Sequence, residues 1–187
     1  MMGPTHRLFG AACGASAAAA TGEPQVMVLM SGLVASATAH GWSSPDVDQT
    51  GPWVAARRAL PGVGRWMNHR TGVTHWWALP VALWFLVEIF VPAEATWPAR
   101  ALIIGWASHL VGDAIFGRIP LWPAGPMIGL GFRTDGFLES GKLWGHRLLP
   151  ISPARIALTA WLAWLAAPLL PDGATTQLTS LLPALLA

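Results

Sequence analysis

The chain alternates between long apolar stretches and shorter polar segments rich in glycine and proline. Its clearest apolar stretch, WWALPVALWFLVEIFV, follows His75 directly and ends at Val91. With a few flanking residues it reaches about 20 residues, the length at which a helix crosses the hydrocarbon core of a bilayer. Pro80 is a candidate kink in this stretch, and Glu88 is its one charge. The pattern therefore predicts a membrane-spanning helix from His75 through Val91.

Four further helices are predicted from apolar stretches that are bounded by Gly, Pro or polar residues. They cover residues 6–20, 26–39, 99–116 and 155–170, and the tail 175–187 is a candidate for a sixth, short or interfacial helix. The first two helices are rich in Ala, Gly and Ser. Small residues of this kind favour close packing between helices over exposure to lipid.

The connection over residues 117–154 is rich in Gly and Pro and is expected to contain only short helices. The chain shows no strand alternation and no internal repeat. We therefore predict an all-α fold: a polytopic membrane helical bundle of about five helices, with a polar site at its cytoplasmic end. The whole chain, residues 1–187, is expected to form a single membrane-embedded helical domain.

The composition agrees with this class and excludes others. Hydrophobic residues make up 53% of the chain and charged residues 11%, against about a quarter charged in soluble domains. The net charge of +2 comes without a polybasic run or a Gly-rich phosphate loop, so no nucleic-acid partner is expected. A single cysteine, Cys13, excludes an intrachain disulfide and a cysteine-based zinc site. Any metal must be held by histidines and carboxylates.

The basic residues predict the orientation in the membrane. Four arginines lie between the second and third helices, and four basic residues lie between the fourth and fifth, namely Arg57, Arg58, Arg65, Arg70, Arg118, Arg133, Lys142 and Arg147. In the predicted topology both connections fall on one side, which the positive-inside rule assigns to the cytoplasm. The expected location is the inner membrane, with several passes and with the site facing the cytoplasm.

Seven candidate metal ligands fall at this same end of the predicted bundle, although they are scattered along the chain. They are His6, Asp46, Asp48, His69, His75, His109 and Asp113. His109 and Asp113 are four residues apart and share one helix face. His69 and His75 are six apart and cannot share a face, so at least one belongs to a loop. Asp46 and Asp48 alternate in a short turn, where one can ligate while the other orients a histidine or bridges a second metal.

Each candidate also has a purely structural interpretation. Asp46 is suited to a turn after Pro45, and His6 to a solvated position at the membrane interface. His40 and His146 are weaker candidates, for which a structural or solvated role is favoured. Asp113 differs, because a carboxylate in an apolar span is costly and usually functional.

Five motifs, taken in order, resemble a known family. They are GPTHRLFG at residues 3–10, PDVD at 45–48, HRTGVTH at 69–75, SHLVGD at 108–113 and LWP at 121–123. Together they resemble the YdjM-type family of bacterial inner-membrane proteins, for which the resemblance implies metal-dependent hydrolysis. The resemblance covers about two thirds of the chain. It departs from the family pattern at two positions. Gln49 follows PDVD where the family has a histidine, and Trp76 follows the HRxxTH-like segment where the family has a serine.

A more distant similarity, carried by His69 and by the spacing of His109 and Asp113, is to zinc-dependent phospholipase C and the P1-type nucleases. Those helical proteins hold a zinc cluster partly through their mature N-terminal residue, and nothing here reproduces that ligand. This similarity bears on the reaction class only.

The ligand set predicts a divalent metal site, with zinc favoured and one or two ions expected. Asp46 or Asp48 is a candidate to accept the proton of the attacking water, and Arg70 to clamp a phosphate. The expected substrate is a phosphoester such as a phospholipid or a lipid-linked phosphate, and the expected partner is membrane lipid. Three alternatives remain: haem binding through His75 and His109, an ion or proton relay through Asp113, and an inactive membrane scaffold.

Overall fold

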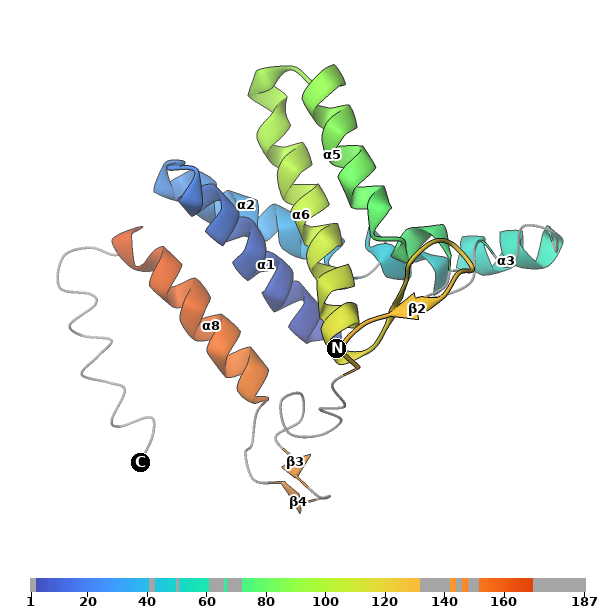
Figure 1. Cartoon of the computed structure of the whole chain (residues 1–187). Helices are drawn as coiled ribbons and strands as arrows, with labels where there is room; N and C mark the ends of the chain where they lie inside the picture. The colour runs from blue at the N-terminus through green and yellow to red at the C-terminus, as the bar shows by residue number, and fades with distance from the viewer. Residues whose placement is uncertain are drawn as a thin grey trace.

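The structure is a computed structural model, and it describes residues 3–40, 43–49, 51–60, 66, 72–131, 142–143, 146–147 and 152–169. Most of the described residues are helical, and five long helices form the body of the molecule (Figure 1). The helices are α1 (Gly3–Ala20), α2 (Gln25–Thr38), α3 (Gly51–Ala59), α5 (Ala78–Phe90), α6 (Ala93–Phe116) and α8 (Pro153–Ala166). Short 3-10 turns are η1 (Pro45–Gln49), η2 (Val73–His75) and η3 (Ala167–Leu169).

The five long helices predicted from the apolar pattern are present with shifted ends, while the candidate tail helix at 175–187 lies outside the described residues. Helix α6 begins at Ala93, not at residue 99. Pro98 does not prevent this earlier start, because a proline so close to the start of a helix removes only one backbone hydrogen bond. Pro80 lies in the first turn of α5, where its missing N–H has no intrahelical partner to lose. Helix α8 begins after Ser152, whose Oγ accepts a hydrogen bond from the backbone N–H of Arg155.

The predictions of no strands, and of only short helices between residues 117 and 154, are wrong. Two short antiparallel pairs occur there: β1 (Ile119–Pro120) with β2 (Met127–Ile128), and β3 (Lys142–Leu143) with β4 (His146–Arg147). Each strand has only two residues, too few for an alternating pattern to be visible in the sequence. The apolar pattern also does not predict the short helix α3.

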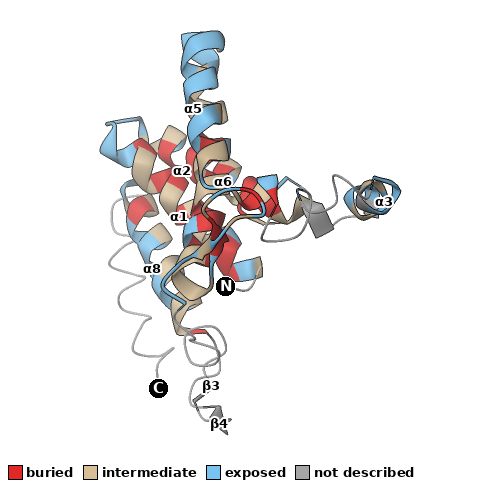
Figure 2. Ribbon diagram, turned by 45° about the vertical axis from the view of Figure 1, so that its right-hand side comes forward, coloured by how far each residue is buried: buried red, intermediate tan, exposed pale blue. Residues whose placement is uncertain are grey.

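The core is formed where α1, α2 and α6 approach one another closely, and small residues make this approach possible. A methyl group on Gly14 would lie 2.5 Å from the Cβ of Ala35, and one on Gly105 would overlap the carbonyl oxygen of the same alanine. Thr38 Oγ1 donates a 2.6 Å hydrogen bond to the carbonyl of Leu102, which joins α2 to α6. In Figure 2 the buried residues gather on these three helices.

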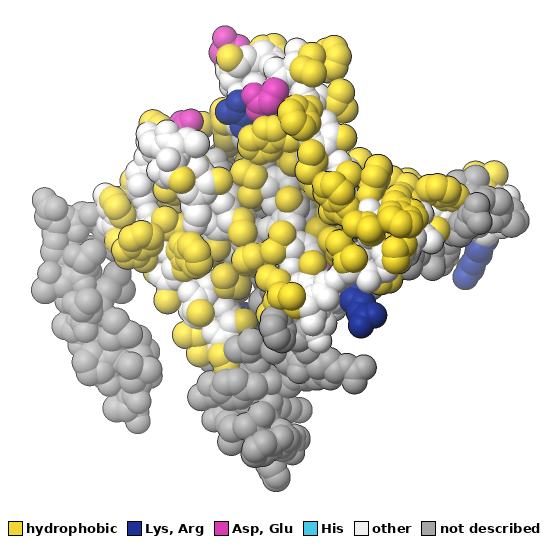
Figure 3. Space-filling model, in the orientation of Figure 1, with side chains coloured by type: hydrophobic (Ala, Val, Ile, Leu, Met, Phe, Trp, Pro, Cys, Tyr) yellow, Lys and Arg dark blue, Asp and Glu magenta, His cyan; other side chains and the backbone are white. Residues whose placement is uncertain are grey.

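Helix α5 lies outside this core and exposes large apolar side chains, including Phe85 (63% exposed), Ile89 (70%) and Phe90 (75%). Figure 3 shows hydrophobic side chains over much of the same face of the molecule. Within the part of the chain that is described, α6 is the one helix long and apolar enough to cross a membrane on its own, while α2 and α5 are apolar but shorter. Such an apolar exterior is what a lipid environment favours.

The charge of Glu88 in the apolar helix α5 is compensated by α6. Arg100 donates two hydrogen bonds of 2.7 Å to the two carboxylate oxygens of Glu88. The guanidinium also lies 5.7 Å from the centre of the Trp84 ring. This fork ties the two helices together near the α5–α6 turn.

Candidate metal centre

Five of the candidate ligands meet at the end of the bundle opposite the α5–α6 turn. His6 comes from the first turns of α1, Asp46 from η1, His75 from the end of η2, and His109 and Asp113 from the last turns of α6. The three histidines and Asp113 are each at most 3% exposed, while the side chain of Asp46 is 18% exposed. Four of the five residues are therefore buried, and Asp46 is the most exposed of them.

Four candidate ligand atoms from η1, η2 and α6 lie close together. Nε2 of His75 lies 3.7 Å from Oδ1 of Asp46 and 3.7 Å from Oδ2 of Asp113. Nε2 of His109 lies 3.6 Å and 3.4 Å from the same two oxygens. These separations exceed the range of about 2.7–3.2 Å for N–H···O hydrogen bonds. They are close to the spacing of about 3.3–3.6 Å between neighbouring ligands of an ion with bonds of about 2.0–2.2 Å.

His6 contacts the other oxygen of Asp113. Its Nε2 lies 3.4 Å from Oδ1 of Asp113, and its ring stacks on His109 with centroids 4.0 Å apart. The carboxylate of Asp113 thus has one oxygen facing His6 and the other facing His75 and His109. A carboxylate used on both oxygens in this way can bridge two ions or hold one and orient a histidine.

The orientation of His109 is fixed by the backbone of Ala39, the residue that follows α2. Its Nδ1 lies 2.8 Å from the carbonyl oxygen of Ala39, and because a carbonyl only accepts, Nδ1 carries the hydrogen. In the neutral ring Nε2 then presents a lone pair. That atom is buried, makes no hydrogen bond, and faces carboxylate oxygens of Asp46 and Asp113.

Lone pairs that face carboxylate oxygens in a buried site repel one another unless a positive charge lies between them. A proton on Nε2 of His109 would point along one direction only, whereas a cation among these atoms would attract the histidine nitrogens and the carboxylate oxygens alike. The geometry of the described residues therefore fits a divalent metal.

The ligands fall into two overlapping groups: His6, His109 and Asp113, and Asp46, His75 and His109. Because Nδ1 of His109 is engaged by Ala39, this residue can give only Nε2, and so it can ligate a single ion. Among the described residues, the cluster can therefore hold one ion through His109, and a second through the remaining oxygen of Asp113 and His6. Cys13 belongs to neither group.

Three of the predicted site residues fall wholly or partly outside the described part of the chain. His69 and Arg70 lie outside the described residues, and of Asp48 the structure describes only the backbone, within η1. His146, a weaker candidate, lies in β4, again with only its backbone described.

His40 lies closer to the centre than the sequence interpretation favoured. Its Nδ1 is 3.5 Å from Oδ2 of Asp46, the oxygen that points away from His75 and His109. The sequence did indicate one thing: His40 comes just after the end of α2, and so at the same end of the bundle as the other histidines. The spacing between His40 and Asp46 matches no helical or strand face, so the contact could not be found from periodicity.

The comparison with protein families gives one match. The model of the family described as YdjM inner membrane protein matches residues 1–176 of the chain, which extends the resemblance beyond the motifs and through α8. No curated protein and no solved structure matches the chain.

Proposed function

The chain belongs to the YdjM inner membrane protein family, and we propose that it is a membrane-bound, metal-dependent hydrolase that acts on a phosphoester carried by a lipid. One observation carries the proposal: Nε2 of His75 and Nε2 of His109 each lie 3.4–3.7 Å from a carboxylate oxygen of Asp46 and from one of Asp113, at one end of the bundle. The set contains no thiolate, which favours zinc, with manganese or iron as other candidates.

A divalent ion in this centre would supply a Lewis acid that activates water and polarises a phosphoryl oxygen. The chain's own residues supply the rest. His109 is held in one tautomer by Ala39, and Asp113 is held between three histidines. Asp46 is the most accessible of the five residues, and its Oδ2 is not the oxygen that faces His75 and His109, so this oxygen is our candidate to accept the proton of the attacking water. Asp48 and Arg70 remain our candidates for a second carboxylate and a phosphate clamp.

The arrangement of the rings argues against haem binding. In a haem, two axial histidines face opposite sides of a planar macrocycle. Here Nε2 of His75 and Nε2 of His109 both face the same two carboxylate oxygens.

The first test of this function is metal content together with hydrolysis. Protein purified in detergent is expected to contain about one or two zinc ions per chain and to hydrolyse a generic phosphodiester such as bis-p-nitrophenyl phosphate. A chelator should abolish the hydrolysis and added zinc should restore it. Stoichiometric metal without hydrolysis of any phosphoester would favour the scaffold alternative, and the absence of bound metal would contradict the proposal.

We also propose that the chain crosses the inner membrane several times with the centre facing the cytoplasm. The single native cysteine permits a direct test. In a Cys13→Ala background, Ser43→Cys lies beside the centre and Ala95→Cys lies near the α5–α6 turn, and both parent residues are exposed. A membrane-impermeant maleimide should label Ala95→Cys in intact spheroplasts and Ser43→Cys only in inverted vesicles. Labelling of both variants from one side would contradict the orientation.

A further inference from the structure

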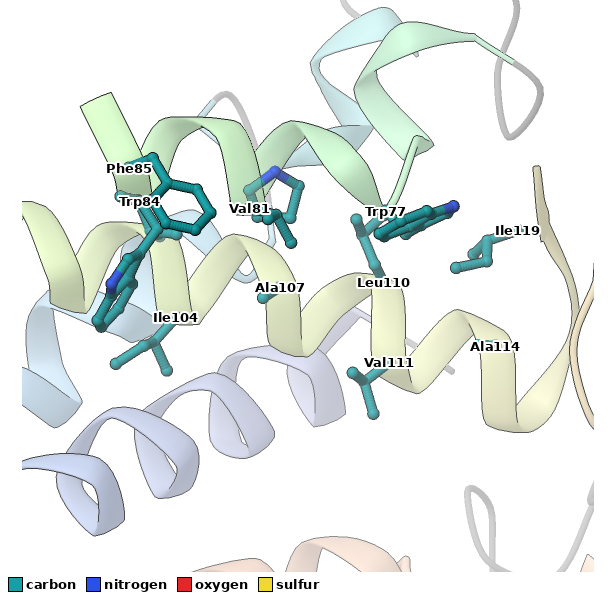
Figure 4. Close-up of a pocket in the computed structure, with 12 residues that line it drawn as sticks. Trp77, Val81, Trp84, Phe85, Ile104, Ala107, Leu110, Val111, Ala114 and Ile119 are labelled. Atoms are coloured by element: carbon teal, nitrogen blue, oxygen red, sulfur yellow. The ribbon is translucent and has the colours of Figure 1, made fainter. Parts of the chain in front are cut away.

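A groove of about 450 Å³ lies between α5 and α6 (Figure 4). Its lining is hydrophobic and includes Trp77, Trp84 and Phe85 from α5 and its N-cap, Ala107 and Ala114 from α6, and Ile119 from β1. The volume falls within the range of about 300–1,000 Å³ that is typical of small-molecule sites.

Small residues of α6 contribute to the floor of the groove, beside larger ones such as Leu110 and Val111. Ala107 and Ala114 are seven residues apart, so they lie on the same side of α6 two turns from each other. They form a shallow floor, and the larger side chains of α5, among them Val81 and Phe85, form a wall whose outer surface is exposed. The groove is therefore open along its length to the surroundings of the protein.

One end of the groove lies at the level of the metal centre. Leu110 and Ala114 line the groove and directly follow His109 and Asp113 in α6. From Ile103 to Ala114 the groove extends about 16 Å along the helix axis. A hydrocarbon chain that lay in the groove would extend from the level of the metal centre towards the α5–α6 turn.

The residues at this end are those expected at a lipid headgroup. Trp77, two residues after His75, and Trp122 are 45% and 53% exposed, and the indole Nε1 of Trp77 donates a 2.9 Å hydrogen bond to the carbonyl of Leu121. Exposed tryptophans gather at the membrane interface. Arg118 adjoins Ile119 and is exposed, so a cation lies beside the end at which a phosphate would sit. At the other end, Arg100 is already paired with Glu88.

We propose that this groove binds one hydrocarbon chain of the phosphoester lipid on which the centre acts, and so selects lipid over soluble phosphoesters. The inference rests on the proposed hydrolase function for the identity of the reacting group. The binding of a hydrocarbon tail is inferred from the groove alone. The occupant is a hydrocarbon tail that enters sideways from the bilayer, with its phosphate at the level of Asp113.

The proposal is tested with a substitution that fills the groove. Ala107→Phe places an aromatic ring over the floor, and Ala160→Phe adds the same ring on an exposed position of α8 as the matched control. Hydrolysis is measured on bis-p-nitrophenyl phosphate and on short-chain and long-chain phosphatidylcholine in mixed micelles. We expect the parent to prefer the long chain. Ala107→Phe should lower kcat/KM for the long chain by about tenfold or more, because the methylenes no longer fit, while the soluble ester and bound zinc are unchanged.

A second readout does not depend on activity. A photoactivatable long-chain phosphatidic acid should crosslink to groove residues in the parent and in Ala160→Phe, and much less in Ala107→Phe. If the parent hydrolyses none of the esters, the hydrolase proposal fails while crosslinking to the groove still supports the chain-binding site. Equal loss on soluble and long-chain esters, crosslinks elsewhere, or a dimer that Ala107→Phe dissociates would each overturn the proposal.

Discussion

Asp113→Asn is expected to remove bound metal and metal-dependent hydrolysis while the protein still inserts and folds. Asp113 contacts His6 through one oxygen and His75 and His109 through the other, so its carboxylate faces all three buried histidines. Asparagine has nearly the same shape but carries no charge and presents only one oxygen. Loss of an outer partner of a metal ligand costs about 10–100-fold in affinity, so loss of this carboxylate should cost on the order of 100-fold or more.

The measurement is zinc per chain and phosphodiester hydrolysis in protein of unchanged size-exclusion profile. Glu94→Gln is the matched control, since it makes the same acid-to-amide change on the same helix at the far end. His109→Ala should also lose the metal, because it removes the one imidazole whose Nε2 joins both groups of ligands. Zinc content and hydrolysis at the parent level in Asp113→Asn would show that this segment only packs, and the hydrolase proposal would lose its main support.

Gly105→Ala is expected to destabilise the bundle although alanine is the better helix former. In a helix interior, alanine is favoured over glycine by about 1 kcal/mol. At this position, however, the added methyl would overlap the backbone carbonyl of Ala35 and the hydroxyl of Thr38 in α2. Overpacking against a backbone atom costs about 1–3 kcal/mol or more, because a whole helix must shift to relieve it.

The shift should also reach the metal centre. Helix α2 leads directly to Ala39, whose carbonyl holds His109 in its tautomer. Gly105→Ala should therefore lower the thermal midpoint by about 5 °C or more and weaken metal binding together. Gly32→Ala provides a graded comparison, since its methyl would meet the Ala11 carbonyl oxygen at 3.0 Å and should cost less. A stability equal to or above that of the parent would show that α2 and α6 are not held at this distance.

The sequence by itself determined where the long helices lie and which chemistry the centre uses. Helices follow from apolar stretches and from the Gly and Pro residues between them, which are local properties of the chain. The shared face of His109 and Asp113 is local as well, because helix geometry places residues four apart side by side. The ligand chemistry follows from composition alone, because a chain with one cysteine has to build a metal site from nitrogen and oxygen atoms.

Only the tertiary structure decided which candidates meet and how they are oriented. His6 and Asp113 are more than a hundred residues apart, and they come together because small residues such as Gly10, Gly14 and Gly105 let α1, α2 and α6 pack closely. The contact of His40 with Asp46 and the fork between Glu88 and Arg100 join segments that share no periodicity. Such contacts depend on how the surfaces of two elements pack against each other. The residue pattern within one element does not predict the surface of the element beside it.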